Sequence, residues 1–170
     1  INTLLKKELV KFIYEEDYRY KFDKISCDKK VILNEEQKYA VEKVVSNLDK
    51  SITYLLYGVT GSGKTEVYMN IISKVIDKNK KAIMLVPEIS LTPQIVSRFV
   101  NRFGSQVAIL HSGLSDTERY DEYRKIKEGK VSIVVGARSA IFAPFSDIGV
   151  IIIDEEHTAT YKQENHPRYH

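Results

Sequence analysis

The stretch Gly58–Thr65 has the residue types and spacing that most directly indicate chemistry. It reads Gly-Val-Thr-Gly-Ser-Gly-Lys-Thr and follows an apolar run at residues 52–57. Its glycines let several backbone N–H groups approach a triphosphate, while Lys64 can reach the β and γ phosphates and Thr65 offers the hard oxygen that Mg²⁺ prefers. The sequence therefore predicts a nucleotide site, with Lys64 also catalytic. The predicted nucleotide-binding residues of this loop are Gly58, Val59, Thr60, Gly61, Ser62, Gly63, Lys64, Thr65 and Glu66.

A second group of candidate residues follows another apolar run. Residues 149–157 read Gly-Val-Ile-Ile-Ile-Asp-Glu-Glu-His, which predicts a strand buried on both faces of a parallel sheet and ending in acids. Asp154 can hold Mg²⁺ through water, and Glu155 can orient or deprotonate an attacking water. For each group taken alone there is a plainer alternative: a solvated acidic turn here, and a Gly-rich turn at residues 58–65.

Apolar periodicity and capping residues predict the elements that position these groups. The segments 52–57, 81–86, 107–111, 131–136 and 150–154 predict five strands. A helix capped by Asn34 is expected before the first strand. Further helices are expected between the strands, one capped by Thr92 with Pro93 at its first position and one by a capping box of Ser115 and Glu118. Alternating strands and helices predict an α/β fold, a parallel sheet with helices on both faces. Ligands bind such sheets at the carboxyl ends of the strands, so Gly58 and Asp154 can share one site.

Composition limits the remaining possibilities. The 170 residues suit one domain, and the net charge of +3 does not by itself demand a nucleic acid. Cys27 is the one cysteine, which excludes an internal disulfide or zinc site, and no apolar run could span a bilayer. Residues 1–30 are charged and rich in tyrosine, which predicts an extension or linker before a nucleotide-binding lobe at 31–170. Because the chain starts without Met and stops without a natural end signal, we expect a piece of a longer protein.

Five motifs in order resemble the first motor lobe of superfamily 2 DNA helicases, and among these the bacterial replication-restart helicases. The motifs occupy residues 58–68, 86–94, 111–119, 136–140 and 154–170. The resemblance implies a RecA-like P-loop lobe of an ATP-driven 3′-to-5′ DNA helicase that uses ATP and Mg²⁺. It also suggests that residues 1–20 are the end of a winged-helix domain.

The same resemblance assigns roles to individual residues. Gln37 lies in a segment that resembles the adenine-recognising motif, although it can equally complete the helix cap begun by Asn34, and both roles can coexist. Arg138, with Thr92 and Ser139, is expected to contact the phosphates of single-stranded DNA. The alternative is that Arg138 is a plain surface residue and Thr92 only a cap.

A final group of predicted residues follows the acids. Tyr161 and Lys162, with Arg168 and Tyr169, resemble an aromatic-rich loop that couples DNA binding to hydrolysis, and aromatic faces can stack on bases. A tail without fixed structure is the alternative. In the family His157 relays the nucleotide state to the DNA contacts, although it could instead be a structural histidine.

The resemblance also implies partners and missing parts. The expected partners are single-stranded or forked DNA, primosome proteins and single-stranded DNA-binding protein, in the cytoplasm near the nucleoid and away from membranes. The chain stops before the Ser-Ala-Thr motif, lacks the second lobe with its arginine, and would have zinc only in an absent C-terminal part. We therefore expect weak nucleotide binding, very slow hydrolysis and no unwinding.

Two other classes of protein use a similar loop. A small-molecule or nucleotide kinase usually has an Arg-rich lid and no Asp-Glu-Glu-His sequence, and a GTPase would need an Asn-Lys-x-Asp motif that is absent here. A non-catalytic nucleotide-binding module would be favoured if Lys64 or Glu155 were replaced, and neither is.

Overall fold

The computed structural model describes residue 11, residues 31–163 and residue 168. The predicted extension at 1–30, including the possible winged-helix end, and the positions 164–167 and 169–170 lie outside the described residues. None of the helices in the described part is both long and apolar enough to span a membrane.

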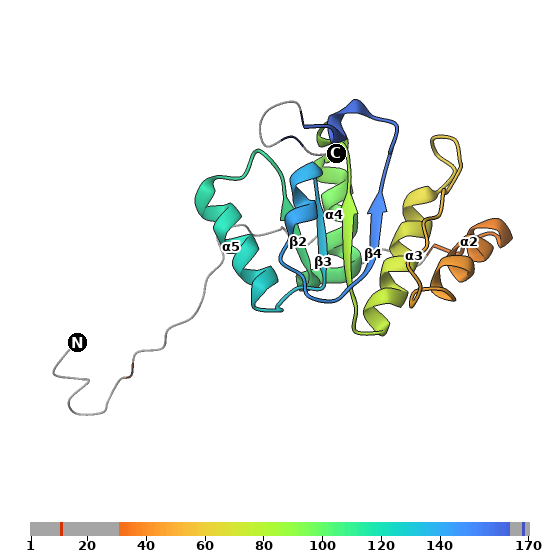
Figure 1. Cartoon of the computed structure of the whole chain (residues 1–170), viewed down its shortest axis with the longest axis horizontal. Coiled ribbons are helices and arrows are strands. Elements are labelled where there is room, and N and C mark those ends of the chain that lie inside the picture. Colours follow the sequence, from red (N-terminus) through yellow and green to blue (C-terminus); the bar gives the residue numbers. More distant parts are fainter. Residues whose placement is uncertain (1–10, 12–30, 164–167, 169–170) are drawn as a thin grey trace.

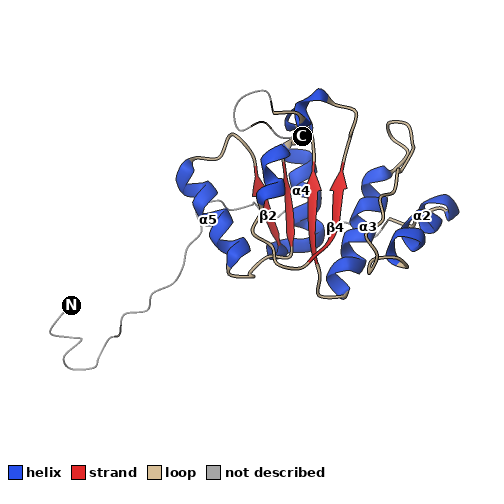
Figure 2. Cartoon of the chain, in the orientation of Figure 1, coloured by secondary structure: helices blue, strands red, loops and turns tan. Residues whose placement is uncertain are grey.

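A parallel sheet forms the centre of the described chain. Its strands are β1 (Lys81–Leu85), β2 (Val107–Leu110), β3 (Ile133–Gly136) and β4 (Ile148–Ile153). They lie in the order β2-β3-β1-β4, and every neighbouring pair is parallel (Figure 2). The α/β fold with a parallel sheet, as predicted from alternating strands and helices, is confirmed.

Four α-helices accompany these strands in the described residues. They are α2 (Glu35–Val45), α3 (Lys64–Asp77), α4 (Pro93–Phe103) and α5 (Asp116–Lys127). The predicted caps are present, because Asn34 and Ser115 form capping boxes and the Thr92 side chain accepts from the Ile95 N–H. Short 3₁₀ helices lie in the connections: η1 (Glu88–Ser90) after β1, η2 (Gly104–Gln106) between α4 and β2, η3 (Arg138–Phe142) after β3 and η4 (Ala159–Tyr161) after β4.

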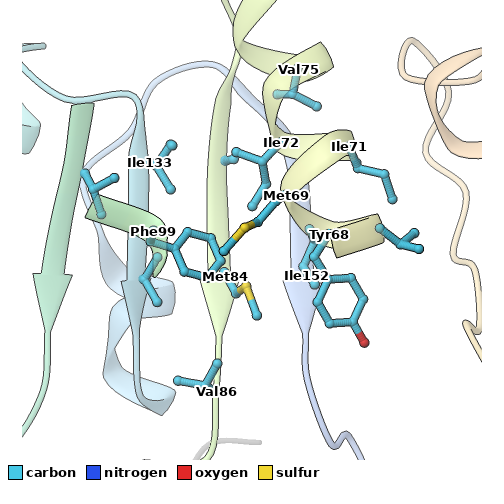
Figure 3. Close-up of a cluster of buried hydrophobic side chains, with 14 of the residues drawn as sticks. Tyr68, Met69, Ile71, Ile72, Val75, Met84, Val86, Phe99, Ile133 and Ile152 are labelled. Atoms are coloured by element: carbon cyan, nitrogen blue, oxygen red, sulfur yellow. The ribbon is translucent and has the colours of Figure 1, made fainter. Parts of the chain in front are cut away.

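Two apolar clusters cover the two faces of the sheet, as the alternating pattern predicts. On one face α3 and α4 pack on the strands, and Met69, Phe99 and Met84 meet there (Figure 3). On the other face α5 and η3 cover Ile83, Val134 and their neighbours. Figure 1 shows the result, with α5 at one end of the sheet and α2 and α3 at the other.

The predicted strand at residues 52–57 is wrong. This segment forms no strand, and Ile52, Leu55 and Tyr57 are exposed, while Leu56 packs against the core. A β-branched and aromatic run favours a strand only where a neighbouring strand can pair with it. Residues 52–57 make no such pairing in this structure, so Gly58 does not follow a strand end as expected.

The prediction that β4 is buried on both faces is also wrong. Only Ile152 is buried, whereas Ile151 and Ile153 are 45% and 48% exposed. The segment 52–57 does not pair with β4, so β4 pairs only with β1 and is the outer strand of the sheet. Its side chains are therefore less covered than those of an inner strand.

The opposite edge of the sheet is closed by a side chain. Glu122 of α5 is fully buried, and its carboxylate accepts a hydrogen bond from the Ile109 N–H of β2 at 3.1 Å. Lys125, one turn further along α5, pairs with the same carboxylate. An edge-strand N–H that faces no other strand is therefore satisfied inside the protein.

Candidate nucleotide site and the loops beside it

Glycine is required by the backbone of the phosphate loop at two positions. Gly61 and Gly63 have φ angles of +81° and +83°, in the left-handed region that other residues rarely adopt. At Gly63, the N-cap of α3, an added Cβ would also lie 2.5 Å from Nε2 of Gln37. The loop is therefore a tight turn that leads directly into the N-terminus of a helix, where backbone N–H groups and the helix dipole favour an anion.

Lys64 opens α3 and folds back over this loop. Its Nζ donates to the carbonyl oxygens of Gly58 at 2.6 Å and Val59 at 3.0 Å. The next residue, Thr65, is half-buried in the first turn of the helix. Lys64 and Thr65 thus both lie in the first turn of α3, next to the loop. If the loop binds a phosphate, Lys64 would exchange its two carbonyl acceptors for phosphate oxygens.

Gln37 joins α2 to the phosphate loop. Its Oε1 accepts from the Asn34 N–H at 3.0 Å, which completes the cap, and its Nε2 donates to the Ser62 carbonyl at 3.0 Å. The capping alternative is therefore confirmed, and the same amide also contacts the loop. The adenine contact stays a prediction.

Glu66, which was predicted among the nucleotide-binding residues, has its carboxylate elsewhere. The side chain is 8% exposed and lies between two arginines of α4, with Oε1 2.8 Å from Arg98 Nη2 and Oε2 3.0 Å from Arg102 Nη1. Its backbone N–H donates to the Gly63 carbonyl within the helix. Neither group faces the phosphate cradle in this arrangement.

Asp154 stands at the end of β4 and is held on several sides. Its N–H donates to the Leu85 carbonyl of β1, and its Oδ1 accepts from the Tyr68 hydroxyl at 3.3 Å and from the Glu155 N–H at 3.2 Å. Glu155 is exposed and has a φ of +46°, which is an unfavourable backbone conformation for a residue with a side chain. Such strain is found where surrounding contacts fix a side chain for function.

The hydrogen bond of Tyr68 links α3, the helix that follows the phosphate loop, to the acids at the end of β4. Tyr68 lies four residues after Lys64, so both project from the same face of α3, about one 5.4 Å turn apart. Asp154 is therefore connected, through the Tyr68 side chain, to the helix into which the phosphate loop leads. The sequence analysis did not give Tyr68 a role, although its spacing from Lys64 was a visible signal.

The oxygen atoms at this position fit Mg²⁺. Thr65 and Asp154 supply one hydroxyl and one carboxylate, and Mg²⁺ typically takes one or two protein ligands and completes its shell with water and phosphate. The described residues contain no group of three or more His, Cys, Asp or Glu side chains that could hold a metal by themselves. The donor set thus suits a metal shared with a bound triphosphate.

Two tyrosines next to Asp154 remain protonated over a wide pH range. Burial, and then the charge of Asp154, raises the pKa of Tyr68 well above its usual value. The same two causes, in the same order, raise the pKa of Tyr161. Both hydroxyls are therefore reliable hydrogen-bond donors, Tyr68 to the Asp154 carboxylate and Tyr161 to the Asp154 backbone carbonyl at 2.6 Å.

A hollow of about 370 Å³ lies at the carboxyl ends of β1, β2 and β3. The residues of the phosphate loop do not line it, so it is separate from the nucleotide position. Arg138 and Ser139, both predicted DNA contacts, line this hollow. The hollow is also lined by residues to which the sequence analysis gave no role, among them Leu110, His111, Ser112, Arg119 and Tyr123, although three of these lie in the motif at residues 111–119. The hollow combines cationic, hydroxyl and aromatic groups on one surface.

Arg138 is half-buried, and its Nη1 donates to the carbonyls of Thr160 and Lys162. It therefore holds the loop that follows the acids, so it is not a plain surface residue. Thr92 is exposed and caps α4, as its alternative reading proposed. Its DNA contact and that of Ser139, which is also exposed, stay predictions.

Tyr161 differs from its prediction. The ring is 8% exposed and packs in the cluster beneath η3, so little of it is available to stack on a base. Its hydroxyl instead anchors the loop to Asp154. Lys162 and His157 are exposed, so both side chains are accessible to a partner. The predicted DNA contact of Lys162 and the predicted relay role of His157 stay predictions. Arg168 is exposed, and Tyr169 lies outside the described residues.

Comparisons with known proteins give one family match and several similar proteins. The family model described as "Type III restriction enzyme, res subunit" matches residues 30–169. A protein named Replication restart protein PriA from Bacillus subtilis is 57% identical over the whole chain, and proteins of the same name from Synechocystis and Chlamydia pneumoniae are 45% and 48% identical over 100% and 81% of the chain. The chain spans only 22%, 21% and 19% of these three relatives.

Proposed function

Because this chain belongs to the family described as type III restriction enzyme, res subunit, we propose that it is the ATP-binding motor lobe of a DNA helicase that acts in replication restart. The fold is a RecA-like helicase lobe. The names of the similar proteins support the second part of the proposal, since three of them are called Replication restart protein PriA. The chain corresponds to about a fifth of each, so the activity of the longer protein is inferred from the site.

One observation carries the proposal, the hydrogen bond from Tyr68 to Asp154. It ties the acids at the end of β4 to the helix that begins with Lys64. From this link we infer that the phosphate loop and the acid pair act on one bound nucleoside triphosphate, which is the arrangement that hydrolyses it.

Each residue has a defined task in this mechanism. The backbone N–H groups of the loop and Lys64 bind the β and γ phosphates. Thr65 and Asp154 would hold Mg²⁺, which neutralises phosphate charge when it is bound. Glu155 orients the attacking water and accepts its proton, and Gln37 contacts the adenine base.

DNA contact is assigned to the other loops. Arg138, Ser139 and Thr92 would bind phosphates of a single strand, with Lys162 as a further cation, while His157 relays the nucleotide state. Such contacts fix the position of the strand without reading its sequence. We extend the proposal to forked DNA, primosome proteins and single-stranded DNA-binding protein as partners, at the nucleoid in the cytoplasm.

The test is the effect of DNA on nucleotide affinity. A fluorescent ATP analogue is titrated into the chain with Mg²⁺ at about 50 mM salt, with and without an oligo(dT) strand, because phosphate contacts weaken steeply as salt rises. The proposal predicts that DNA changes the analogue affinity by roughly fivefold or more. Arg138→Gln should weaken oligo(dT) binding, whereas Lys74→Gln, which removes an exposed cation of α3, should not. An analogue affinity that is the same with and without DNA would instead favour a kinase or a non-catalytic nucleotide module.

A further inference from the structure

The buried carboxylate of Glu66 is a charged group that the proposed hydrolysis does not use. It lies one residue after Thr65 on α3, and both of its oxygens are bound by arginines of α4. Arg98 and Arg102 are four residues apart, so they project from one face of α4. Each forms an ion pair with one oxygen of the Glu66 carboxylate. Two charge-assisted hydrogen bonds fix the direction of the contact as well as its distance.

This contact joins the two functional regions over a short distance. Glu66 is two residues from Lys64, and Arg98 is six residues from Thr92, the N-cap of α4. At about 1.5 Å per residue, the helical path from Arg98 to Thr92 is roughly 9 Å. The segment before Thr92, residues 86–92, follows β1 and includes residues that line the hollow.

Apolar packing alone would hold α4 against α3 less specifically. Phe99 of α4 contacts the cluster that contains Met69 of α3, and Figure 3 shows these two side chains with Met84 between the helices and the sheet. Such contacts permit small sliding movements, since dispersion forces have little directionality. A buried ion pair often adds little net stability, whereas it can fix one relative arrangement.

We propose that Glu66, with Arg98 and Arg102, is a positioning residue that transmits nucleotide binding at the phosphate loop to the segment 86–92, which ends at the proposed DNA contact Thr92. The inference rests on the proposed function, because it presumes that this segment contacts DNA. When Lys64 and Thr65 engage a triphosphate, the first turn of α3 adjusts. The ion pair moves α4 and its N-cap Thr92 with that turn.

The experiment measures the coupling factor, which is the analogue affinity with oligo(dT) divided by the affinity without it. Arg98→Gln is the main variant, because its side chain is 43% exposed and the chain should still fold. The expected result is a coupling factor that moves toward one by about twofold or more, with the affinity for each ligand alone within about threefold of the unaltered chain. A structural role alone would change stability and leave this ratio unaltered.

A matched control is available. The Lys130 side chain is 44% exposed and lies 2.8 Å from Glu128. Its exposure and its distance to the carboxylate are thus close to those of Arg98. The Lys130–Glu128 pair lies after α5, however, and does not connect α3 to α4. Lys130→Gln should therefore leave the coupling factor unchanged. Glu66→Gln and the double variant Glu66→Gln/Arg98→Gln complete a double-mutant cycle, in which Arg98→Gln should cause no further loss once Glu66 is altered. Arg102→Gln tests the second arginine in the same way.

The outcomes separate the inference from the proposed function. If the unaltered chain shows no effect of DNA on analogue affinity, the proposed function fails, and this inference fails with it. If the unaltered chain shows coupling and Arg98→Gln and Arg102→Gln both retain it in full, the inference alone is overturned. Should Glu66→Gln lose its near-ultraviolet circular dichroism, the two arginine variants decide the question by the same criterion. Additive losses in the cycle would also overturn the inference.

Discussion

The two outer strands of the sheet differ in how their edges are completed. At β2, the buried Glu122 carboxylate accepts the Ile109 N–H, and α5 covers that side of the sheet. At β4, neighbouring residues of the strand remain about half exposed, and the apolar segment 52–57 does not pair with it. The β2 edge of the sheet is therefore completed by a side chain of α5, and we call this the closed half. The β4 edge has no such cover, and we call this the open half, which contains the phosphate loop and the acids.

The residues that stabilise the fold and the residues of the candidate site lie mostly in different halves of the sheet. The strands β1, β2 and β3 and the helices on them contain most of the fully buried side chains. Lys64, Asp154 and Glu155 lie on the more open half, together with the left-handed backbone of Glu155. Regions that must rearrange around a ligand are expected to have lower local stability than the core. Substitutions in the two halves should therefore have different consequences.

The largest effect is expected at the closed edge. Glu122→Ala removes the acceptor of the Ile109 N–H and the carboxylate that pairs with Lys125 inside the protein. Breaking such a buried pair costs about 3–5 kcal/mol of unfolding free energy. Glu128→Ala, at an exposed pair, should cost less than about 1 kcal/mol. Urea denaturation followed by circular dichroism measures both, and equal costs would remove the distinction between the closed half and the surface.

The second prediction reverses the pattern in the open half. Lys64→Ala removes charge-assisted bonds to two phosphates, so the affinity for a fluorescent ATP analogue should fall by about 100-fold or more. The unfolding free energy should change by less than about 1 kcal/mol, because Lys64 is half-buried and its partners are carbonyls of an exposed loop. Analogue titration and urea denaturation of the same variant test both statements. An unchanged analogue affinity would contradict the assignment of the loop.

A smaller effect should appear at high pH. A tyrosine of the unfolded chain ionises near pH 10, whereas burial and the Asp154 charge raise the pKa of Tyr68 in the folded chain. Above about pH 10 the unfolded state loses a proton that the folded state keeps, so stability is full at lower pH and falls as the pH rises. The slope for one such group is at most about 1.4 kcal/mol per pH unit.

Tyr68→Phe should reduce this decline, because phenylalanine does not ionise. Urea midpoints measured from about pH 8 to pH 11 for the chain and for the variant give the difference, which cancels the lysines that titrate in the same range. Identical pH profiles would mean that burial and the Asp154 charge do not raise the pKa of Tyr68 in solution.

Local sequence was sufficient for much of this fold. Asn34, Thr92 and Ser115 cap their helices because a cap depends on residues within one turn. The runs at 81–86, 107–111 and 131–136 form strands because they are apolar on both sides and find partners on both faces of the sheet. The segment 52–57 has a similar composition, but a strand also needs a neighbour to pair with, and that requirement lies outside its own sequence.

In the candidate site too, the features that depend on contiguous residues were predictable, and the long-range contacts were not. The positive φ angles of Gly61 and Gly63 and the position of Lys64 follow from a motif that is contiguous in sequence. The bond from Tyr68 to Asp154 and the ion pair of Glu66 join residues 86 and 32–36 positions apart. Such contacts depend on how α3 packs against β4 and α4, which no local pattern specifies.

The central claim is that the phosphate loop and the acids form one nucleotide site, and the Mg²⁺ dependence of analogue binding tests it most directly. The affinity of the fluorescent ATP analogue is measured with Mg²⁺ and with EDTA, for the chain and for Asp154→Asn. We predict that Mg²⁺ strengthens binding to the chain and that Asp154→Asn loses most of this gain, by about tenfold or more, while its affinity in EDTA stays within about threefold. If Asp154→Asn keeps the full Mg²⁺ effect, the acids do not share the metal of the bound triphosphate and the account is contradicted.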